Sequence, residues 1–170
     1  MQRGAAAIGS SLFMALAPGT VAGLVPWWLT GWRGHPWWPP APVFGGALVL
    51  AGGVVLVQAF ARFVVEGLGT PAPVAPTQHL VVGGLYRYVR NPMYLAVVAV
   101  ILGQALLFGR LVLVVYAAVV GALMWAFATW YEEPALASKF GQEYEQYRSA
   151  VPGWRPRLRP WTAADPPSAG

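Results

Sequence analysis

The chain of 170 residues is 57% hydrophobic and only 10% charged, whereas about a quarter of the residues in a soluble domain carry charge. This composition excludes an ordinary soluble domain and favours a protein folded in a lipid bilayer. The net charge of +5 needs no nucleic acid to explain it, because a bias of basic residues toward a membrane surface suffices. With no cysteine and two distant histidines, disulfides and thiolate sites are excluded and no metal is expected.

Long uncharged intervals follow one another along the chain, and each can hold the roughly 20 apolar residues that a spanning helix needs. They predict four transmembrane helices, near residues 5–29, 42–63, 92–109 and 111–131. The fold class expected is therefore an all-α membrane protein, with a single integral membrane domain over residues 1–161. The last residues, 162–170, are rich in Ala, Pro and Ser and are expected to be disordered.

The distribution of lysine and arginine predicts the orientation, because loops rich in these residues stay in the cytoplasm. If the N-terminus is inside, all of the 11 basic residues except Arg33 and Arg110 lie inside. We therefore expect both termini on the cytoplasmic side of the cell inner membrane. The outer loop should place a belt of tryptophans at the headgroup level: Trp27, Trp28, Trp32, Trp37 and Trp38.

Small and polar residues within the spans predict how the helices pack. Small residues allow helices to approach closely in membranes, and a polar group in hydrocarbon must find a partner. The glycines of the second span are Gly45, Gly46, Gly52 and Gly53. Gln58 and Gln104 are expected to form interhelical hydrogen bonds. The short connection at Gly109 and Arg110 predicts a tight hairpin between the last two spans.

The inner loop ends in the densest polar and aromatic stretch of the chain, residues 79–94. Pro92 suits the first turn of the third span, and Asn91 would then be its N-cap. A helix N-terminus beside Arg90 would form an anion site. Anchoring of Arg87 and Arg90 to anionic lipid explains these residues equally well.

The fourth span ends in two acidic residues, Glu132 and Glu133, which topology does not explain because acidic residues contribute little to it. A carboxylate can accept both hydroxyls of a ribose or hold an ammonium group, although capping of the tail helix is the alternative. In that tail, apolar residues recur at steps of three and four: Leu136, Phe140, Tyr144, Tyr147 and Val151. This period predicts an amphipathic helix that lies on the membrane or closes over the inner ends of the spans.

Loop and tail meet on one side of the membrane, so a charged site should be built there. Its parts suit a nucleotide-like zwitterion, with an anion site for a carboxylate and acids for a ribose or amine. Tyr86, Tyr88 or Tyr94 would hold an adenine, and an aromatic face also attracts a sulfonium cation. The chain has no Gly-rich dinucleotide fingerprint and no phosphate loop with its lysine.

The motifs occur in a fixed order between residues 68 and 156. They are Leu80-Val81 with Gly84 and Tyr86, Arg90-Asn91-Pro92-Met93-Tyr94, Glu132-Glu133, Phe140-Gly141 with Tyr144 and Tyr147, and Val151-Pro152. This order resembles the membrane methyltransferases related to isoprenylcysteine carboxyl methyltransferase and phospholipid methyltransferase. The resemblance implies that S-adenosyl-L-methionine is the cofactor and that a lipophilic acceptor, a carboxylate, amine or thiol, enters from the bilayer.

The resemblance also implies roles for individual residues. The cofactor would contact Gln78, His79, Leu80, Val81, Gly84, Tyr86, Asn91, Pro92, Tyr94, Glu132 and Glu133. Arg90 and Glu133 would be the catalytic residues, with Arg90 orienting an anionic acceptor or the cofactor's carboxylate. Arg90, Tyr147 and Arg148 would line the acceptor side.

One position departs from the family pattern, since Asn91 stands where the eukaryotic carboxyl methyltransferases have histidine. Asparagine does not titrate near neutral pH and therefore cannot be a general base. An amine or thiol acceptor would then need His79 or a glutamate to remove its proton. Two other readings stay open: a non-catalytic membrane scaffold or accessory subunit, and a fragment related to membrane sterol-type reductases.

Overall fold

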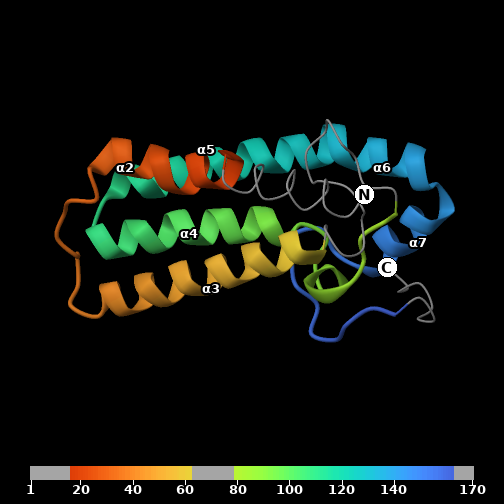
Figure 1. The fold of residues 1–170 in the computed structure, drawn as a ribbon, viewed down its shortest axis with the longest axis horizontal. Coiled ribbons are helices and arrows are strands. Elements are labelled where there is room, and N and C mark those ends of the chain that lie inside the picture. The colour runs from red at the N-terminus through yellow and green to blue at the C-terminus, as the bar shows by residue number, and fades with distance from the viewer. Residues whose placement is uncertain (1–15, 63–78, 163–170) are drawn as a thin grey trace, which may run out of the picture.

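A computed structural model describes residues 16–62 and 79–162, and the regular structure of these residues is entirely helical (Figure 1). The elements are η1 (Thr20–Leu24), α2 (Val25–Thr30), α3 (Ala41–Arg62), η3 (Gly84–Arg87), α4 (Pro92–Phe108), α5 (Leu111–Phe127), η4 (Ala128–Glu132), α6 (Glu133–Phe140) and α7 (Gln142–Ala150). The predicted all-α fold is thus confirmed for this part of the chain. The expectations for residues 5–15, for the start of the inner loop and for residues 163–170 lie outside the described residues.

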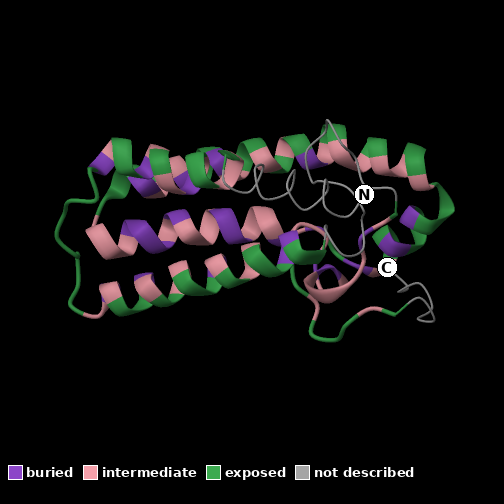
Figure 2. Cartoon of the chain, in the orientation of Figure 1, coloured by how far each residue is buried: buried purple, intermediate pink, exposed green. Residues whose placement is uncertain are grey.

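Helices α3, α4 and α5 run side by side and reverse direction at each connection (Figure 1). Apolar residues of α4 and α5, together with Ala22, form the main buried cluster: Val97, Ile101, Ala105, Leu113, Ala117 and Val120. Figure 2 shows α4 largely buried or half-buried in the middle, with exposed outer faces on α3 and α5. Those outer faces carry exposed large apolar side chains such as Leu50, Val57, Val115 and Leu123. A bilayer would cover such faces, whereas water would not stabilise them.

The close approach of α3 to α4 depends on glycine. A methyl group on Gly45 would lie 2.6 Å from the carbonyl oxygen of Gly103, and one on Gly103 would lie 2.7 Å from that of Gly45. A methyl group on Gly52 would meet the Val100 side chain at 2.7 Å. The expected packing role is therefore confirmed for Gly45 and Gly52. It is wrong for Gly46, and likewise for Gly53, because both face open space on the other side of α3.

Gln104 connects three segments of the bundle. Its Nε2 donates to the carbonyl oxygen of Ala22 at 2.6 Å, and its Oε1 accepts from Nε1 of Trp32 at 3.0 Å. The interhelical hydrogen bond expected of this buried amide is thus present. Gln58, by contrast, is exposed on the last turns of α3, so its side-chain amide does not need a hydrogen-bond partner within the protein.

The predicted tight hairpin between α4 and α5 is present. Gly109 ends α4 in the left-handed conformation, with φ 58°, and its N–H bonds to the carbonyl oxygen of Ala105. Arg110 then donates from Nε to the carbonyl oxygen of Arg33 at 2.8 Å. This contact fastens the hairpin to the α2–α3 loop, at the end of the bundle that carries the exposed tryptophans.

Two helices, not four, are by themselves long and apolar enough to cross a membrane within the described residues: Ala41–Arg62 and the continuous helix Leu111–Phe140. The apolar helix Pro92–Phe108 has 17 residues, about 25 Å at the α-helical rise, which falls short of the hydrocarbon thickness of about 30 Å. The first expected span begins outside the described residues, and its later part contains the π-helical turn η1. The four-span prediction is therefore corrected to two candidate spans.

The tail is helical as expected, but a bend divides the expected helix. The π-helical turn η4 precedes Pro134, whose ring clashes with the carbonyl of Trp130 in a regular α-helix. Gly141, with φ 53° and ψ −125°, then separates α6 from α7. The apolar stripe survives this bend, because Tyr144, Tyr147 and Val151 form one buried cluster.

Candidate functional site

Four segments meet at the end of the bundle opposite the tryptophan-rich loop: loop residues 79–91, helices α6 and α7, and the C-terminal strap, defined as residues 151–161 (Figure 1). The buried cluster of α7 packs against Leu80 and Val82 of the loop and Trp161 of the strap. Helix α7 therefore packs on the loop that precedes α4. Loop and tail, far apart in sequence, share one site.

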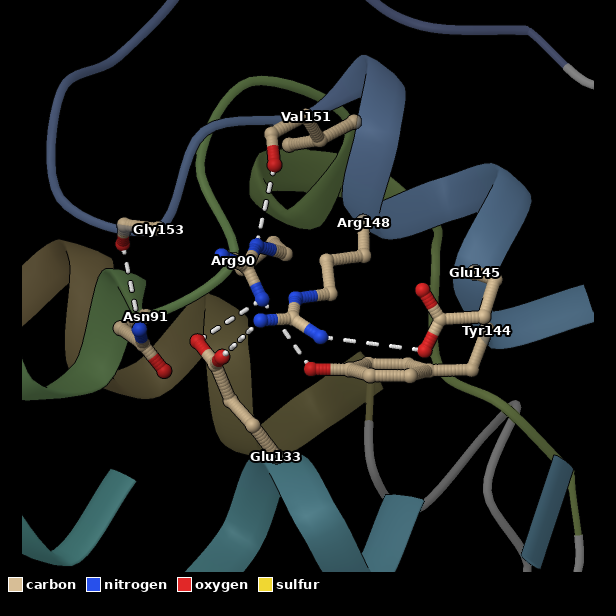
Figure 3. Close-up of polar contacts among 8 residues, drawn as sticks. All are labelled: Arg90, Asn91, Glu133, Tyr144, Glu145, Arg148, Val151 and Gly153. Carbon is tan, nitrogen blue, oxygen red and sulfur yellow. Dashed lines mark hydrogen bonds and ion pairs between the residues drawn. The ribbon is translucent and has the colours of Figure 1, made fainter. Parts of the chain in front are cut away.

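The side chain of Arg90 lies at the centre of this site (Figure 3). Nη1 donates to Oε1 of Glu133 at 2.9 Å and to the hydroxyl oxygen of Tyr144 at 3.0 Å. Nε donates to the carbonyl oxygen of Val151 at 3.0 Å. One planar guanidinium thus joins the start of α6, helix α7 and the strap, which a lysine ammonium could not do with the same fixed geometry.

Glu133 has a second cationic partner. Its Oε2 lies 3.4 Å from Nη2 of Arg148, and its side chain is 14% exposed, as is that of Arg90. Arg148 also lies 3.8 Å from Glu145, but the side chains of that pair are 47% and 56% exposed. The pair of Arg90 and Glu133 is therefore the shielded one, and the outer pair is open to screening by water.

Backbone hydrogen bonds hold the strap to the loop. The N–H groups of Arg90 and Asn91 donate to the carbonyl oxygens of Pro152 and Gly153, at 3.0 and 3.3 Å. Farther along, the N–H of Arg157 donates to the carbonyl oxygen of Tyr88 at 2.9 Å. These backbone hydrogen bonds hold the strap beside the N-terminus of α4, where the sequence predicts an anion site.

Asn91 does occupy the N-cap position of α4, and Pro92 begins that helix, as expected. Its side chain makes no capping hydrogen bond. Instead, Nδ2 donates to the carbonyl oxygen of Gly153 at 3.2 Å. Gly153 is buried, and a methyl group on it would lie 3.1 Å from Nη2 of Arg90. The absence of a side chain there leaves space beside the guanidinium.

Glu132 belongs to a second polar group, beside the first. It accepts a hydrogen bond from the hydroxyl of Tyr94 at 2.7 Å. The Tyr94 ring in turn stacks on Trp154 of the strap, with ring centroids 6.2 Å apart. The two glutamates thus have different partners: Glu133 faces arginine, and Glu132 faces a phenol held by an indole.

The remaining loop residues expected at the site have mainly packing contacts. Val81 and Tyr86 are buried in a small cluster with Ala59, and Leu80 packs against the α7 cluster. Tyr147 donates a buried hydrogen bond to the carbonyl oxygen of Tyr86 at 2.7 Å. His79 is exposed, and Gln78 lies outside the described residues.

Burial also changes the pKa values of the two tyrosines of α7, Tyr144 and Tyr147. It raises the pKa of Tyr147 above its ordinary value of 10.0, and the nearby positive charge of Arg90 opposes this effect only in part. The pKa of Tyr144 is raised by burial as well, against the same opposing charge. Both hydroxyls therefore stay protonated at neutral pH and remain hydrogen-bond donors.

A cavity of about 390 Å³ lies beside this site, between the end of α3 and η3, and is lined by Gln58, Ala61, Arg62, Gly84 and Leu85. Gly84 has φ 58°, and a methyl group on it would lie 2.8 Å from Nε of Arg62. The left-handed φ is what favours glycine at this position, because the Arg62 side chain could move away from a methyl group. Of the described residues expected at the cofactor, only Gly84 lines this cavity.

Sequence reasoning missed Trp154 and the polar role of Tyr144. The sequence places Tyr144 in the apolar stripe and in the family motif but predicts no polar contact for it, although its hydroxyl oxygen accepts a hydrogen bond from Arg90. Trp154 stands two residues after Pro152 of the Val151-Pro152 motif, and an aromatic residue at this position was the available signal. Nothing in the sequence indicated the contacts of the strap's main-chain carbonyls, because every residue carries a backbone carbonyl group.

The donor set bears on which ligands fit. The two carboxylates can hold an ammonium or ribose hydroxyls, and the rings of Tyr94 and Trp154 offer aromatic faces. Across residues 16–62 and 79–162, no group of three or more His, Asp or Glu residues could hold a metal ion. The carboxylates of Glu132 and Glu133 and the ring faces of Tyr94 and Trp154 are groups that a zwitterionic organic cofactor would contact.

Comparisons with known proteins identify the family and one relative of this chain. The model of the phospholipid methyltransferase family matches residues 41–143. Over 82 residues, the chain is 39% identical to a protein-S-isoprenylcysteine O-methyltransferase from Schizosaccharomyces pombe. That match covers 46% of this chain and 34% of the relative, so the chain spans about a third of the relative's length. No solved structure matches.

Proposed function

The chain belongs to the phospholipid methyltransferase family, and we propose that it transfers a methyl group from S-adenosyl-L-methionine to a lipophilic acceptor taken from the bilayer. The observation that carries this proposal is the meeting of two carboxylates, Glu132 and Glu133, with the loop motif that begins at Arg90. Both carboxylates are oriented by partners from α4 or its preceding loop. Such fixed acceptors suit the ammonium and ribose groups of the cofactor.

The cofactor supplies an already activated methyl group on a sulfonium, so catalysis can come mostly from holding two reactants in line. In this proposal the carboxylates of Glu132 and Glu133 hold the polar groups of the cofactor. Tyr94 and Trp154 present their ring faces beside Glu132. Leu80, Val81, Tyr86, Asn91 and Pro92 would contact the cofactor from the loop and the start of α4, and Gly84 lines the adjoining cavity. His79 is exposed beside these residues, and Gln78 is included on the family resemblance alone.

Arg90 has two tasks in this proposal. Through Nε and Nη1 it positions Glu133 against α7 and the strap. Its Nη2, beside Gly153, orients an anionic group of the acceptor or the cofactor's carboxylate. Arg148, which is 47% exposed, and Tyr147 border the acceptor side.

The acceptor's chemistry decides whether a base is needed. A carboxylate acceptor is already nucleophilic at neutral pH and needs none. An amine or thiol would have to lose a proton, and the nearby groups able to accept it are His79 and the two glutamates. Asn91 cannot take this role.

The site is proposed to face the cytoplasm from the inner membrane, with both termini on that side. Arg33 and Arg110 lie at the opposite end of the bundle, where Arg110 bonds to the Arg33 carbonyl. The other described basic residues lie at or near the site end: Arg62, Arg87, Arg90, Lys139, Arg148, Arg155, Arg157 and Arg159. This asymmetry supports the orientation through the positive-inside rule.

Binding of S-adenosylhomocysteine to the detergent-purified protein tests the cofactor without knowledge of the acceptor. We expect saturable binding in a calorimetric titration, weakened at least about tenfold in Glu133→Ala, which corresponds to about 1.4 kcal/mol. Glu145→Ala is the matched control, because it removes an exposed carboxylate from the same arginine network. Circular dichroism and gel filtration would establish that each variant is folded.

Transfer of a labelled methyl group to a membrane lipid extract would then identify the acceptor class by hydrolysis, since a methyl ester is cleaved by base whereas an N-methyl group is not. If the folded protein bound no S-adenosylhomocysteine, the methyltransferase proposal would fail. The non-catalytic scaffold or accessory subunit would then account for the chain. Binding of a nicotinamide cofactor instead would favour the reductase-like reading.

A further inference from the structure

The C-terminal strap carries a surface that the proposed chemistry does not use. Its middle part reads Arg155-Pro156-Arg157-Leu158-Arg159-Pro160. Leu158 is 99% exposed, and Arg155 and Arg159 are exposed on either side of it. Among the described residues, no carboxylate pairs with either of these two arginines. A fully exposed apolar side chain between two exposed arginines suits a charged, partly apolar surface.

The strap is held by hydrogen bonds within this surface, at Arg157, and just after it, at Trp161. Arg157 donates from its backbone N–H to Tyr88 and from Nη1 to the carbonyl oxygen of Ala150 at 3.2 Å. The N–H of Trp161 donates to the carbonyl oxygen of Arg87, and Nε of Arg87 donates back to the carbonyl oxygen of Trp161 at 2.7 Å. Prolines at positions 156 and 160 restrict the backbone further. Leu158 therefore projects from a fixed segment.

The position of the strap relative to the membrane follows from its contacts. The strap bonds to η3 and to the residue after it, and η3 packs on the last turn of α3 through Gly84 and Arg62. Helix α3 has 22 residues, about 33 Å, so its ends lie near the edges of a hydrocarbon layer about 30 Å thick. The strap consequently lies at headgroup level, at the same end of the bundle as α6 and α7 (Figure 1).

We propose that residues 155–159 form a docking surface for anionic lipid headgroups, into which Leu158 inserts as a short apolar wedge while Arg155 and Arg159 bind the surrounding phosphates. The occupant is the surface of the bilayer that holds the helices, because the surface combines uncompensated positive charge with an apolar tip at the membrane edge. Each arginine near an anionic leaflet favours the docked state by about fivefold. The proposal rests on membrane insertion and not on methyl transfer.

Site-directed labelling tests this directly, since the chain contains no cysteine. A nitroxide attached at Leu158→Cys would be measured in nanodiscs of phosphatidylcholine alone or mixed with phosphatidylglycerol. Its collisions with oxygen and with a water-soluble nickel chelate report its depth. Leu158 makes so little contact that the substitution leaves the fold intact. Ser149→Cys, exposed on α7, is the control for position.

We expect phosphatidylglycerol to move the nitroxide at position 158 from chelate-accessible to oxygen-accessible, and high salt to reverse the change. Arg155→Gln combined with Arg159→Gln should abolish the lipid dependence. Arg33→Gln combined with Lys139→Gln removes the same net charge elsewhere and should leave it unchanged. Equal depth in both lipid mixtures, or a lipid dependence that survives loss of both strap arginines, would overturn the proposal.

Discussion

The coupling between Arg90 and Glu133 can be predicted from the surroundings of each group. Removing the Arg90 side chain deletes three hydrogen bonds, to Glu133, Tyr144 and Val151. A hydrogen bond contributes about 1 kcal/mol, and one to a charged group about 1.5–3 kcal/mol. Arg90→Ala should therefore destabilise the protein by about 3–5 kcal/mol. Glu133→Ala should cost somewhat less, because the Arg90 guanidinium keeps two neutral acceptors.

The double variant separates a specific ion pair from two independent losses. Once Arg90 is gone, Glu133 remains as a largely buried carboxylate with only Arg148 at 3.4 Å, so removing it as well relieves part of the penalty. We expect the double variant to be about 1.5–3 kcal/mol more stable than the sum of the two single effects predicts.

Equilibrium unfolding in mixed micelles, followed by far-UV circular dichroism, would give the four free energies of unfolding that this cycle needs. Arg148 and Glu145 form the matched control pair, because they are 3.8 Å apart and about half exposed; their coupling should stay below about 0.5 kcal/mol. Additive effects for Arg90 and Glu133, within about 0.5 kcal/mol, would refute the reasoning that this pair acts as one unit.

Three further results are expected. Tyr94→Phe should lower the free energy of unfolding by about 1–3 kcal/mol and weaken S-adenosylhomocysteine binding, because Glu132 loses its hydrogen-bond donor. Calorimetry measures both effects, and unchanged binding would show that Glu132 does not contact the cofactor. Gly45→Ala should destabilise by about 1–3 kcal/mol through its clash with α4, whereas Gly46→Ala on the open face should not, and equal unfolding midpoints would contradict the packing described. Burial raises the pKa of Tyr147 in the folded state. The contribution of this residue to stability is therefore complete below the ordinary pKa of 10.0 and is lost as pH rises through the pKa of the folded state. Tyr147→Phe should reduce this loss of stability at alkaline pH in a pH series of unfolding midpoints, and an unchanged pH dependence would exclude Tyr147 as its source.

Local patterns predicted the parts of the fold that depend on local interactions. The apolar interval 92–109 corresponds to α4, residues 92–108, because Pro92 favours a helix start and Gly109 a helix end. The spacing of the tail's apolar residues likewise predicted the buried stripe of α7. It missed the bend at Gly141, since periodicity records which face is apolar and not one residue's dihedral angles.

The candidate site was predictable as a set of residue types but not as a set of contacts. Arg90 and the acidic pair were identified from their positions at the ends of spans. Their partners include the carbonyl oxygens of Val151, Pro152 and Gly153, which look alike in every residue.

By itself, the sequence determined an all-helical chain with membrane-crossing segments, its family, and the end of the molecule where charged and aromatic groups gather, because hydropathy and ordered motifs are properties of the chain. Only the tertiary structure decided which face of α3 meets α4, which glutamate pairs with which partner, and that the strap binds the loop. Those outcomes depend on helix rotation and on backbone groups about 60 residues apart, such as Arg90 and Val151, which become neighbours only after the helices have packed.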